Sequence, residues 1–405
     1  MKRLVLLFVM FSSISCTSGT DEYVEIDVPI YKDIFTLDLT IEDGDTESEP
    51  ILVEPSGIAI NNEGYIYVSD EECVKVFNSQ GQFIQQIGRE GQGPGEFVAA
   101  FGVTTGPTGV LTAMDILWEF NIYSPDGSFL RKSRYRVEDL TKNYIQEEGF
   151  TFTMLNDVIS LDREEQIIDL FALDLINQEK YPAFEQLLFV KSDTLMELCQ
   201  YHTRNSVKLS ESSNSSINLS GDFLWSMTDA GQIVYTETGI DYSHDGKGSR
   251  YFLNLVTLDD LERDTIAVPY TTLRIPAACK SRYEFSIVVM GEVINIDIDP
   301  ELLKMEQQTE FYPPLKFLLT DGNRLFGFHY SVLDSIWHDM DEEGKMIPCT
   351  ADIIDLDSGL LIARAEFPFI PDVISDEHAY LLNAPDDDFP SIQRYRIDPR
   401  IYNQH

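Results

Sequence analysis

Apolar and polar residues alternate most clearly between positions 56 and 97, where four short runs follow one another. The runs are residues 57–60, 65–68, 74–77 and 82–87. The first two runs are separated by residues 61–64 (Asn-Asn-Glu-Gly), and the last two by residues 78–81 (Asn-Ser-Gln-Gly). Both segments favour a tight hairpin turn, because Asn and Gly tolerate a positive φ. Four strands joined by hairpins within about 35 residues predict one antiparallel sheet with the size of a propeller blade.

Such a sheet is too small to bury its own faces, so it requires copies, and the chain contains them. Residues 121–130 repeat the pattern of residues 75–84 about 45 positions later, with the turn in the same place. Less regular copies are expected at residues 151–196, 223–268, 316–365 and 372–397. In the first of these, we expect Asn156 and Asp157 to form the turn of the inner hairpin.

Counting the sheets gives six, and the last lacks its fourth strand while the N-terminus has strands left over. Residues 23–39 are the candidate to fill that place, which would remove open sheet edges that invite aggregation. The predicted fold class is therefore all-β: a six-bladed β-propeller whose ring is closed by an N-terminal strand in the last blade. Three insertions are expected: residues 174–185, partly helical; a Ser/Asn-rich mobile loop at 210–220; and a helix at 299–310.

The start of the chain has the pattern of an export signal. A basic region at residues 1–3 precedes eight apolar residues, too few to span a bilayer, and then small residues up to Cys16. Ser15 before Cys16 resembles a bacterial lipoprotein signal, in which the cysteine becomes the lipidated first residue. Ordinary secretion is the alternative, because Ser13 stands where such signals prefer Leu. We expect a signal peptide at 1–15, a tether at 16–22 and the propeller at 23–405, anchored by lipid to the outer membrane of a bacterial envelope, on its periplasmic or outer surface.

The charge of the chain restricts its partners. Asp and Glu number 69 against 29 Lys and Arg, which gives a formal net charge of −40. Such a field repels phosphate backbones and anionic membrane surfaces, so nucleic acid is excluded and membrane contact is expected only through the lipid. Cations, cationic peptides and neutral glycans stay open as ligands, and a solubilising coat of charge is the alternative explanation.

Four cysteines remain besides Cys16, namely Cys73, Cys199, Cys279 and Cys349. An even number in an oxidising compartment permits one or two disulfides, whose pairing the spacing does not define. Four separate buried thiols are the alternative, and the absence of a Cys-x-x-Cys motif disfavours a structural zinc cluster.

Four short motifs between residues 55 and 97 carry a resemblance to a known repeat. They are Pro55-Ser56-Gly57-Ile58-Ala59, Gly64-Tyr65-Ile66-Tyr67-Val68-Ser69-Asp70, Val76-Phe77-Asn78-Ser79-Gln80-Gly81 and Gly91-Gln92-Gly93-Pro94-Gly95-Glu96-Phe97. This stretch resembles an NHL-type repeat, and with the signal the chain looks like the exported six-bladed β-propeller lipoproteins of bacteria. The resemblance is specific for the fold, and it leaves the function open because propellers host many unrelated activities.

Asp70 and Asp115 end the second strand of the first two predicted blades. In six-bladed lactonases and amidating lyases, carboxylates at the channel mouth hold calcium, so the resemblance makes calcium a possible cofactor here. The alternative is that both carboxylates accept backbone N–H groups and cap the turn between strands.

Other motifs do not assemble into a recognisable catalytic pattern. The glycine run at residues 88–95 lacks the Lys-Ser/Thr of a P-loop and is expected to connect two blades. The six histidines are scattered, with His329 and His338 as a conceivable pair at the rim. The acidic runs at 339–343 and 386–388 lack calcium-loop spacing. Trp118, Trp225 and Trp337 either stack on a ligand at the channel mouth or pack in the core.

The function favoured by these observations is a non-enzymatic one. We expect a monomeric binding or scaffold module that holds a peptide, a glycan or an envelope protein. The alternative is a calcium-assisted hydrolase or lyase of the lactonase type that works in the central channel. No catalytic or cofactor-binding residue is assigned; Cys16 is the one modification site predicted.

Overall fold

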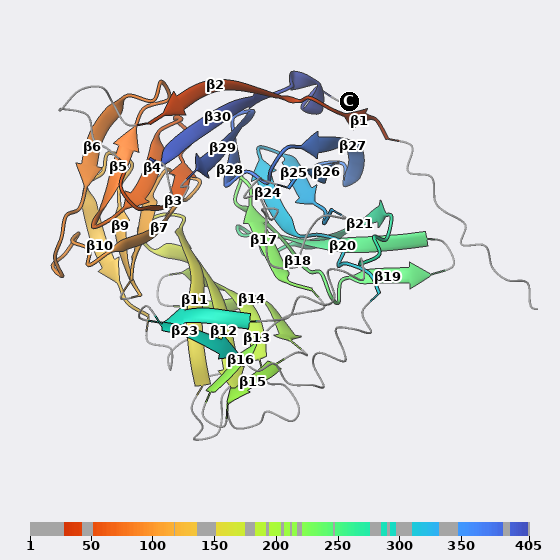
Figure 1. The fold of residues 1–405 in the computed structure, drawn as a ribbon, viewed down its shortest axis with the longest axis horizontal. Helices are drawn as coiled ribbons and strands as arrows, with labels where there is room; N and C mark the ends of the chain where they lie inside the picture. The colour runs from red at the N-terminus through yellow and green to blue at the C-terminus, as the bar shows by residue number, and fades with distance from the viewer. Residues whose placement is uncertain are drawn as a thin grey trace, which may run out of the picture.

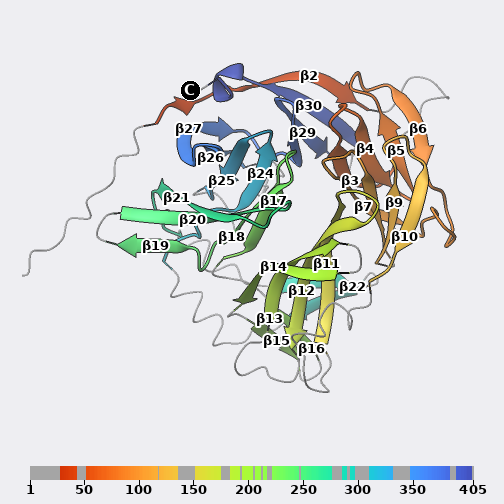
Figure 2. The same ribbon diagram turned by 180° about the vertical axis from the view of Figure 1, so that it is seen from behind.

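The computed structural model describes residues 28–42, 52–116, 118–135, 151–174, 183–191, 194–203, 206–210, 213–216, 221–245, 248–275, 285–289, 292–296, 310–331, 347–383 and 389–403. These residues form a six-bladed β-propeller, as predicted, with the sheets set around a central channel (Figures 1 and 2).

Each blade is an antiparallel sheet that begins at the channel and ends at the outside of the ring. Blade 1 contains β3 (Pro55–Ile60), β4 (Ile66–Asp70), β5 (Cys73–Phe77) and β6 (Phe83–Ile87). Blade 2 contains β7 (Ala100–Thr105), β8 (Leu111–Asp115), β9 (Glu119–Tyr123) and β10 (Phe129–Ser133). Blade 3 contains β11 (Thr151–Ser160), β12 (Glu165–Asp174), β13 (Ala183–Lys191) and β14 (Thr194–Thr203).

The second half of the ring follows the same order. Blade 4 contains β17 (Phe223–Met227), β18 (Gln232–Glu237), β20 (Gly248–Thr257) and β21 (Arg263–Tyr270), with β19 (Tyr242–Asp245) also paired to β20. Blade 5 contains β24 (Phe317–Asp321), β25 (Arg324–Phe328), β26 (Cys349–Asp355) and β27 (Leu360–Phe367). Blade 6 contains β28 (Val373–Ser375), β29 (His378–Asn383) and β30 (Ser391–Ile397), followed by the 3₁₀ turn η2 (Pro399–Ile401).

The N-terminal segment closes the ring, which confirms the sequence prediction. Strand β2 (Phe35–Ile41) pairs antiparallel with β30 and becomes the outermost strand of blade 6. The preceding β1 (Ile30–Tyr31) pairs in parallel with β27 of blade 5, a contact that the sequence pattern did not predict. Figure 1 shows β1 and β2 running along the rim beside β27 and β30. The segment therefore joins two blades at once.

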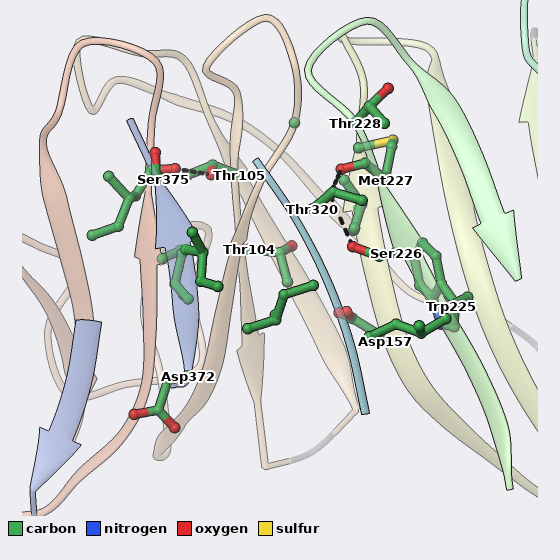
Figure 3. Close-up of a pocket in the computed structure, with 18 of the residues that line it drawn as sticks. Thr104, Thr105, Asp157, Trp225, Ser226, Met227, Thr228, Thr320, Asp372 and Ser375 are labelled. Carbon is green, nitrogen blue, oxygen red and sulfur yellow. Dashed lines mark hydrogen bonds between the residues drawn. The ribbon is translucent and has the colours of Figure 1, made fainter. Parts of the chain in front are cut away.

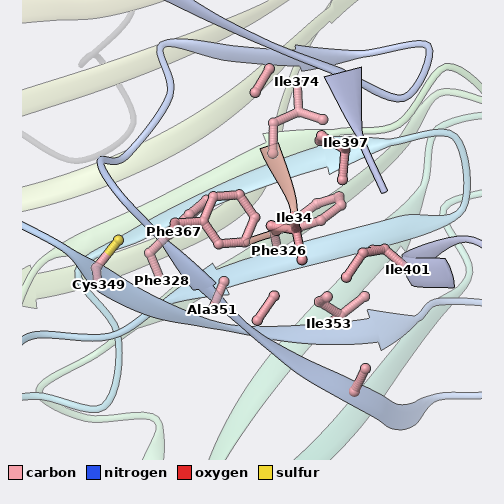
Figure 4. Packing of buried hydrophobic residues seen from close by; sticks show 13 residues of the cluster. Ile34, Phe326, Phe328, Cys349, Ala351, Ile353, Phe367, Ile374, Ile397 and Ile401 are labelled. Atoms are coloured by element: carbon pink, nitrogen blue, oxygen red, sulfur yellow. The ribbon is translucent and has the colours of Figure 1, made fainter. Parts of the chain in front are cut away.

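Hydrophobic residues gather in one cluster at each of the junctions between neighbouring blades. Side chains of successive residues point to opposite faces of a strand, so Leu325 packs toward blade 4 and Phe326 toward blade 6. Figure 4 shows the cluster between blades 5 and 6, where Ile34 and Ile401 pack beside Phe326. Because both faces of a blade are covered, strands such as β4, β5 and β25 are buried along their whole length.

Polar contacts also link every pair of neighbouring blades. In order around the ring they are Thr105 Oγ1 to Ile60 O, Thr104 Oγ1 to Val158 O, Trp225 Nε1 to Asp169, Thr320 Oγ1 to Met227 O, the Asp376 amide to Asp321, and Arg394 to Ser79 O. Donor–acceptor distances lie between 2.6 and 2.9 Å. Most of these contacts use strand or turn residues beside the channel, so they fix the width of the ring.

Two expectations for individual segments were wrong, and a third falls mostly outside the described residues. Asn156 and Asp157 are not a turn: β11 continues through them as one strand, and the extra residue forms a bulge in the pairing with β12. The insertion at 174–185 was expected to be partly helical: residues 183–185 belong to β13, and residues 175–182 lie outside the described residues. The predicted loop at 210–220 contains β16 (Ser213–Ser216), which pairs with β15 (Ser206–Ser210). The expected helix at 299–310 falls almost entirely outside the described residues, as does Cys16, and a hairpin of β22 (Phe285–Val289) and β23 (Glu292–Ile296) precedes it.

Candidate functional site

The central channel forms a cavity, which the innermost strands of all six blades surround. It encloses about 500 Å³. Its wall is mostly aliphatic and hydroxyl side chains, including Thr104, Ser226 and Thr320, with the indole of Trp225 on one side (Figure 3). Among the described residues that line it there is no Lys, Arg, His or Cys, whereas carboxylates are present. The channel wall is therefore about equally polar and apolar, and it contains acidic side chains but no basic ones among the described residues.

Two of these carboxylates, Asp157 on β11 and Asp169 on β12, are paired directly opposite each other in the register of blade 3. The bulge at Asn156 places Asp157 on the same side as Asp169, since directly opposite residues share a face of the sheet. Asp169 accepts the indole N–H of Trp225 at 2.8 Å and an amide N–H of Asn156 at 3.4 Å. The partner of Asp157 is the amide of Val158, at 2.7 Å.

Protein surrounds this pair, and like charges face each other, so both carboxyl groups hold their protons more tightly than usual. Burial and the charge of Asp169 raise the pKa of Asp157 to about 7, and burial raises the pKa of Asp169 to about 6. On the next strand, burial and the charges of Asp169, Asp222 and Glu237 raise the pKa of Glu185 to about 8. The junction of blades 3 and 4 therefore concentrates acidic groups that bind protons near neutral pH.

Asp70 and Asp115, the carboxylates that the sequence placed at the channel mouth, are buried and do not line the channel. Asp70 accepts the backbone N–H groups of Val53 and Glu54 at 2.7–3.1 Å and pairs with Lys75 at 2.5 Å. Asp115 accepts the N–H of Val98 at 2.7 Å. Each carboxylate holds the segment leading into the innermost strand of its own blade, instead of the turn between strands. Both carboxylates therefore bind backbone N–H groups, as the alternative to calcium binding predicted, but at the start of the innermost strand and not at the turn between strands.

A second polar cluster surrounds Asp352 in blade 5, whose side chain is fully buried. One oxygen accepts Nε of Arg364 at 2.7 Å, and the other lies 2.9 Å from the hydroxyl of Tyr251 and 3.0 Å from Nε2 of His329. Burial alone would raise the pKa of Asp352, but His329 and Arg364 hold it below its usual value. Nδ1 of His329 lies 2.6 Å from the carbonyl of Pro314, so the ring is fixed at both ends. His329 is therefore one element of a structural network, while His338 lies outside the described residues.

At the rim formed by the hairpin turns, Asp321 connects blades 5 and 6. Its carboxylate accepts the amides of Asp376 and Glu377, each at 2.9 Å, and the hydroxyl of Tyr402 at 2.7 Å. Neighbouring turns add Glu63 to the same rim, which is therefore acidic. These hydrogen bonds give the carboxylate of Asp321 a structural role in joining blades 5 and 6.

The remaining predicted groups have ordinary surroundings or lie outside the described residues. Cys73, Cys199 and Cys349 are buried and are not joined to one another by a disulfide, and Cys279 lies outside the described residues. The glycine run connects β6 to β7, as predicted, and Glu96 within that connection binds Arg89 and the Gly93 amide. Trp118 is exposed at the turn between β8 and β9, away from the channel. Trp337 and both acidic runs, at 339–343 and 386–388, are not described.

Sequence reasoning missed Asp157 and Asp169. Asp169 stands inside the apolar run Ile167-Ile168-Asp169-Leu170, and a charged residue in a buried run is uncommon unless it has a role. The position of Asp169 within this apolar run was therefore the one sequence signal that could have identified it. Asp157 was misread because Asn-Asp resembles a turn.

No group of three or more His, Cys, Asp or Glu side chains among the described residues is arranged to hold a metal ion. Within the same part of the chain, no helix has the length and apolar character needed to cross a membrane.

Residues 43–186 match the model of a family described as "6-bladed beta-propeller". That part of the chain is similar to the family. No curated protein matches the chain.

Three solved structures are distant likenesses. The β-propeller domain of Cps50 (Swd1) from Myceliophteria thermophila shares 12% identity over 90% of this chain and 99% of its own, with a TM-score of 0.36. YCF48, solved bound to D1 peptide, shares 8% identity over 90% of this chain and 100% of its own, with a TM-score of 0.35. A protein of unknown function from Bacteroides caccae shares 10% identity over 78% of this chain and 86% of its own, with a TM-score of 0.30. Likeness at this level supports no statement about function.

Proposed function

We propose that this protein is an exported binding module whose central channel holds a segment of a partner peptide. The observation that carries the proposal is the composition of the channel wall. Aliphatic side chains offer apolar contact, Thr and Ser hydroxyls offer hydrogen bonds, and Asp157 and Asp169 offer negative charge. A cavity of this size with a few convergent polar groups is the usual form of a ligand site.

A peptide fits this wall better than a glycan or a nucleic acid. Acidic side chains without a basic neighbour in the lining favour a cationic partner, which Lys, Arg or an N-terminus supplies and a neutral glycan does not. The net charge of −40 opposes nucleic acid. An envelope protein that presents an extended basic segment is the partner we propose, bound by a monomeric propeller.

Export and lipidation are part of the proposal and rest on residues 1–16 of the sequence. The test is incorporation of a labelled fatty acid into the full chain in a bacterial host. We expect label and membrane fractionation for the native chain and neither for Cys16→Ser. Secretion without label would exclude the lipid anchor and leave the channel proposal standing.

Selection from a displayed peptide library tests the binding role. Val373 lines the channel and Leu360 lies exposed on the outermost strand of blade 5, so each is replaced by Trp. We expect Val373→Trp to weaken binding of the selected peptides at least tenfold and Leu360→Trp to leave it unchanged. Equal binding to both variants, or a library that yields no binder, would overturn the proposal.

A hydrolase or lyase is the second candidate, favoured by one observation. The paired carboxyl groups of Asp157 and Asp169 have pKa values of about 7 and 6, so they can exchange protons near neutral pH. Turnover of lactones or esters with calcium present, abolished in Asp169→Asn, would support this candidate. No turnover by the native protein would remove it.

A further inference from the structure

Asp157 and Asp169, at the junction of blades 3 and 4, make no hydrogen bond or ion pair with a cationic side chain among the described residues. Asp157 and Asp169 are directly opposite in register, and like charges at that position destabilise a sheet. The bonds to Asp169 come from the neutral donors Trp225 and Asn156, and the bond to Asp157 comes from a backbone amide. These contacts reduce the cost of burying the two carboxyl groups, and none of them comes from a cationic side chain.

The neighbouring strands add further acid groups. Glu185 on β13 has one carboxylate oxygen, Oε2, that is buried without a hydrogen-bond partner. Asp222 and Glu237, at the inner edge of blade 4, raise the pKa of Glu185 through their charges. Asp157 and Asp169 line the channel itself, and the other three acidic side chains lie behind them, outside its lining. The described lining of that channel supplies no cation in return.

The same corner has an apolar wall. Trp225, Leu224 and Ile159 line the channel beside Asp157 and Asp169. Figure 3 shows Trp225 and Asp157 side by side on the same part of the wall. The alkyl stem of a long basic side chain can pack on such a surface while its charged end meets the carboxylates, and the face of an indole attracts a cation directly.

The geometry points to a seat for one lysine or arginine side chain of the bound peptide, between Asp157 and Asp169 and against Trp225. This inference rests on the proposed function and specifies the chemistry that the channel recognises. An organic cation is favoured over a metal ion, because no three acidic, histidine or cysteine side chains among the described residues are arranged to ligate one.

Two probes separate this inference from the proposed function. The first is n-butylguanidinium, compared with its neutral analogue n-butylurea, by calorimetry and thermal shift of the full chain. The second is a capped pentapeptide with a central arginine, compared with the same peptide carrying citrulline. We expect the charged member of each pair to bind at least tenfold more tightly, and the difference to shrink as salt is added.

Three variants locate the seat. Asp157→Asn and Asp169→Asn keep the shape of the side chain and should each reduce the preference for the charged probe at least tenfold. Asp229→Asn is the matched control, because it removes a carboxylate from the lining at the turn-side end of the channel. It should leave the preference within twofold of native.

The outcomes are distinguishable. The inferred binding site is wrong if butylguanidinium and butylurea bind equally well. It is also wrong if Asp157→Asn and Asp169→Asn keep the native preference for butylguanidinium. If the arginine and citrulline peptides bind in the channel equally well, the inferred binding site for a basic side chain is wrong, and the proposed function still stands. Binding of butylguanidinium that depends on Asp157 and Asp169, with no peptide held, supports the seat and overturns the proposed function.

Discussion

The indole N–H of Trp225 in blade 4 donates to the carboxylate of Asp169 in blade 3 across 2.8 Å. The bond joins two blades at the edge of the channel, and it holds the indole beside the carboxylate pair. Replacing Trp225 by Phe keeps the ring but removes the donor. We expect a loss of about 1–3 kcal/mol, because an acceptor with high negative charge is left with a weaker set of partners. Chemical denaturation measures this, and a variant as stable as native would contradict it.

The stability of the propeller should fall as pH rises. Asp157, Asp169 and Glu185 have pKa values of about 7, 6 and 8 in the folded chain, above the values near 4 of unfolded carboxyl groups. The folded state therefore binds more protons, so their contribution is complete below about pH 4 and is lost progressively up to pH 8. We expect the melting temperature to decrease by several degrees between pH 5 and pH 8.

The matched variant for the pH effect is Asp157→Asn, which cannot ionise. Its melting temperature should vary less with pH than that of the native chain and should exceed it at pH 8, since the repulsion with Asp169 is gone. Parallel pH profiles for the two proteins would show that the carboxylate pair is not the origin of the effect.

Gly106 permits the close approach of blades 2 and 3. A Cβ atom at this position would collide with the backbone carbonyl of Ser160 on β11, which cannot move without breaking the strand pairing. Gly106→Ala should therefore destabilise the protein by about 2 kcal/mol or more. Gly102→Ala is the control, because Gly102 lies within β7, four residues before Gly106. Its Cβ would lie 3.7 Å from the nearest atom, the end of the Met114 side chain, so this substitution should cost less than about 1 kcal/mol.

Arg364 and Lys32 test how burial changes the value of an ion pair. Arg364→Met leaves the buried Asp352 without its main positive partner and should destabilise by about 3–5 kcal/mol. Lys32 pairs with Glu366, but the two side chains are 64% and 47% exposed, so Lys32→Met should change stability by less than about 1 kcal/mol. Urea unfolding of both variants measures the difference. Similar losses would contradict the assignment of Asp352 as a structural centre.

Removal of the N-terminal strands should open the ring. A chain that starts at residue 52 lacks β1 and β2, so β30 becomes an unpaired edge. We expect a lower melting temperature and aggregation through that edge. A chain that starts at residue 28 keeps both strands and is the control, expected to stay monomeric by light scattering.

The fold was predictable because each repeat carries its own local signals. Turns such as residues 61–64 and 78–81 define hairpins through Asn and Gly, and six such sheets have few ways to bury their faces. The closing strand was predictable for the same reason, as an unpaired edge in blade 6 required a partner. The pairing of β1 with β27 was not, because two residues carry no periodicity.

The channel site was much less predictable. A local pattern identifies strands, but the residues that meet at the channel come from all six blades, and their convergence depends on how the ring closes. Asp157 was assigned to a turn because Asn-Asp favours one locally, and the long pairing of β11 with β12 overrode that preference. Asp70 and Asp115 were placed correctly at strand ends, but their bonds to incoming backbone follow only from the three-dimensional structure.

If Cys16 carries the proposed lipid, the position of β1 limits the distance between the propeller and the membrane. Fourteen positions separate Cys16 from Ile30, the first residue of the strand that β27 holds. A fully stretched chain of that length reaches about 50 Å. A lipid on Cys16 would therefore hold the outer edge of blade 5 within about 50 Å of the membrane surface. Only partners close to that surface would then reach the channel.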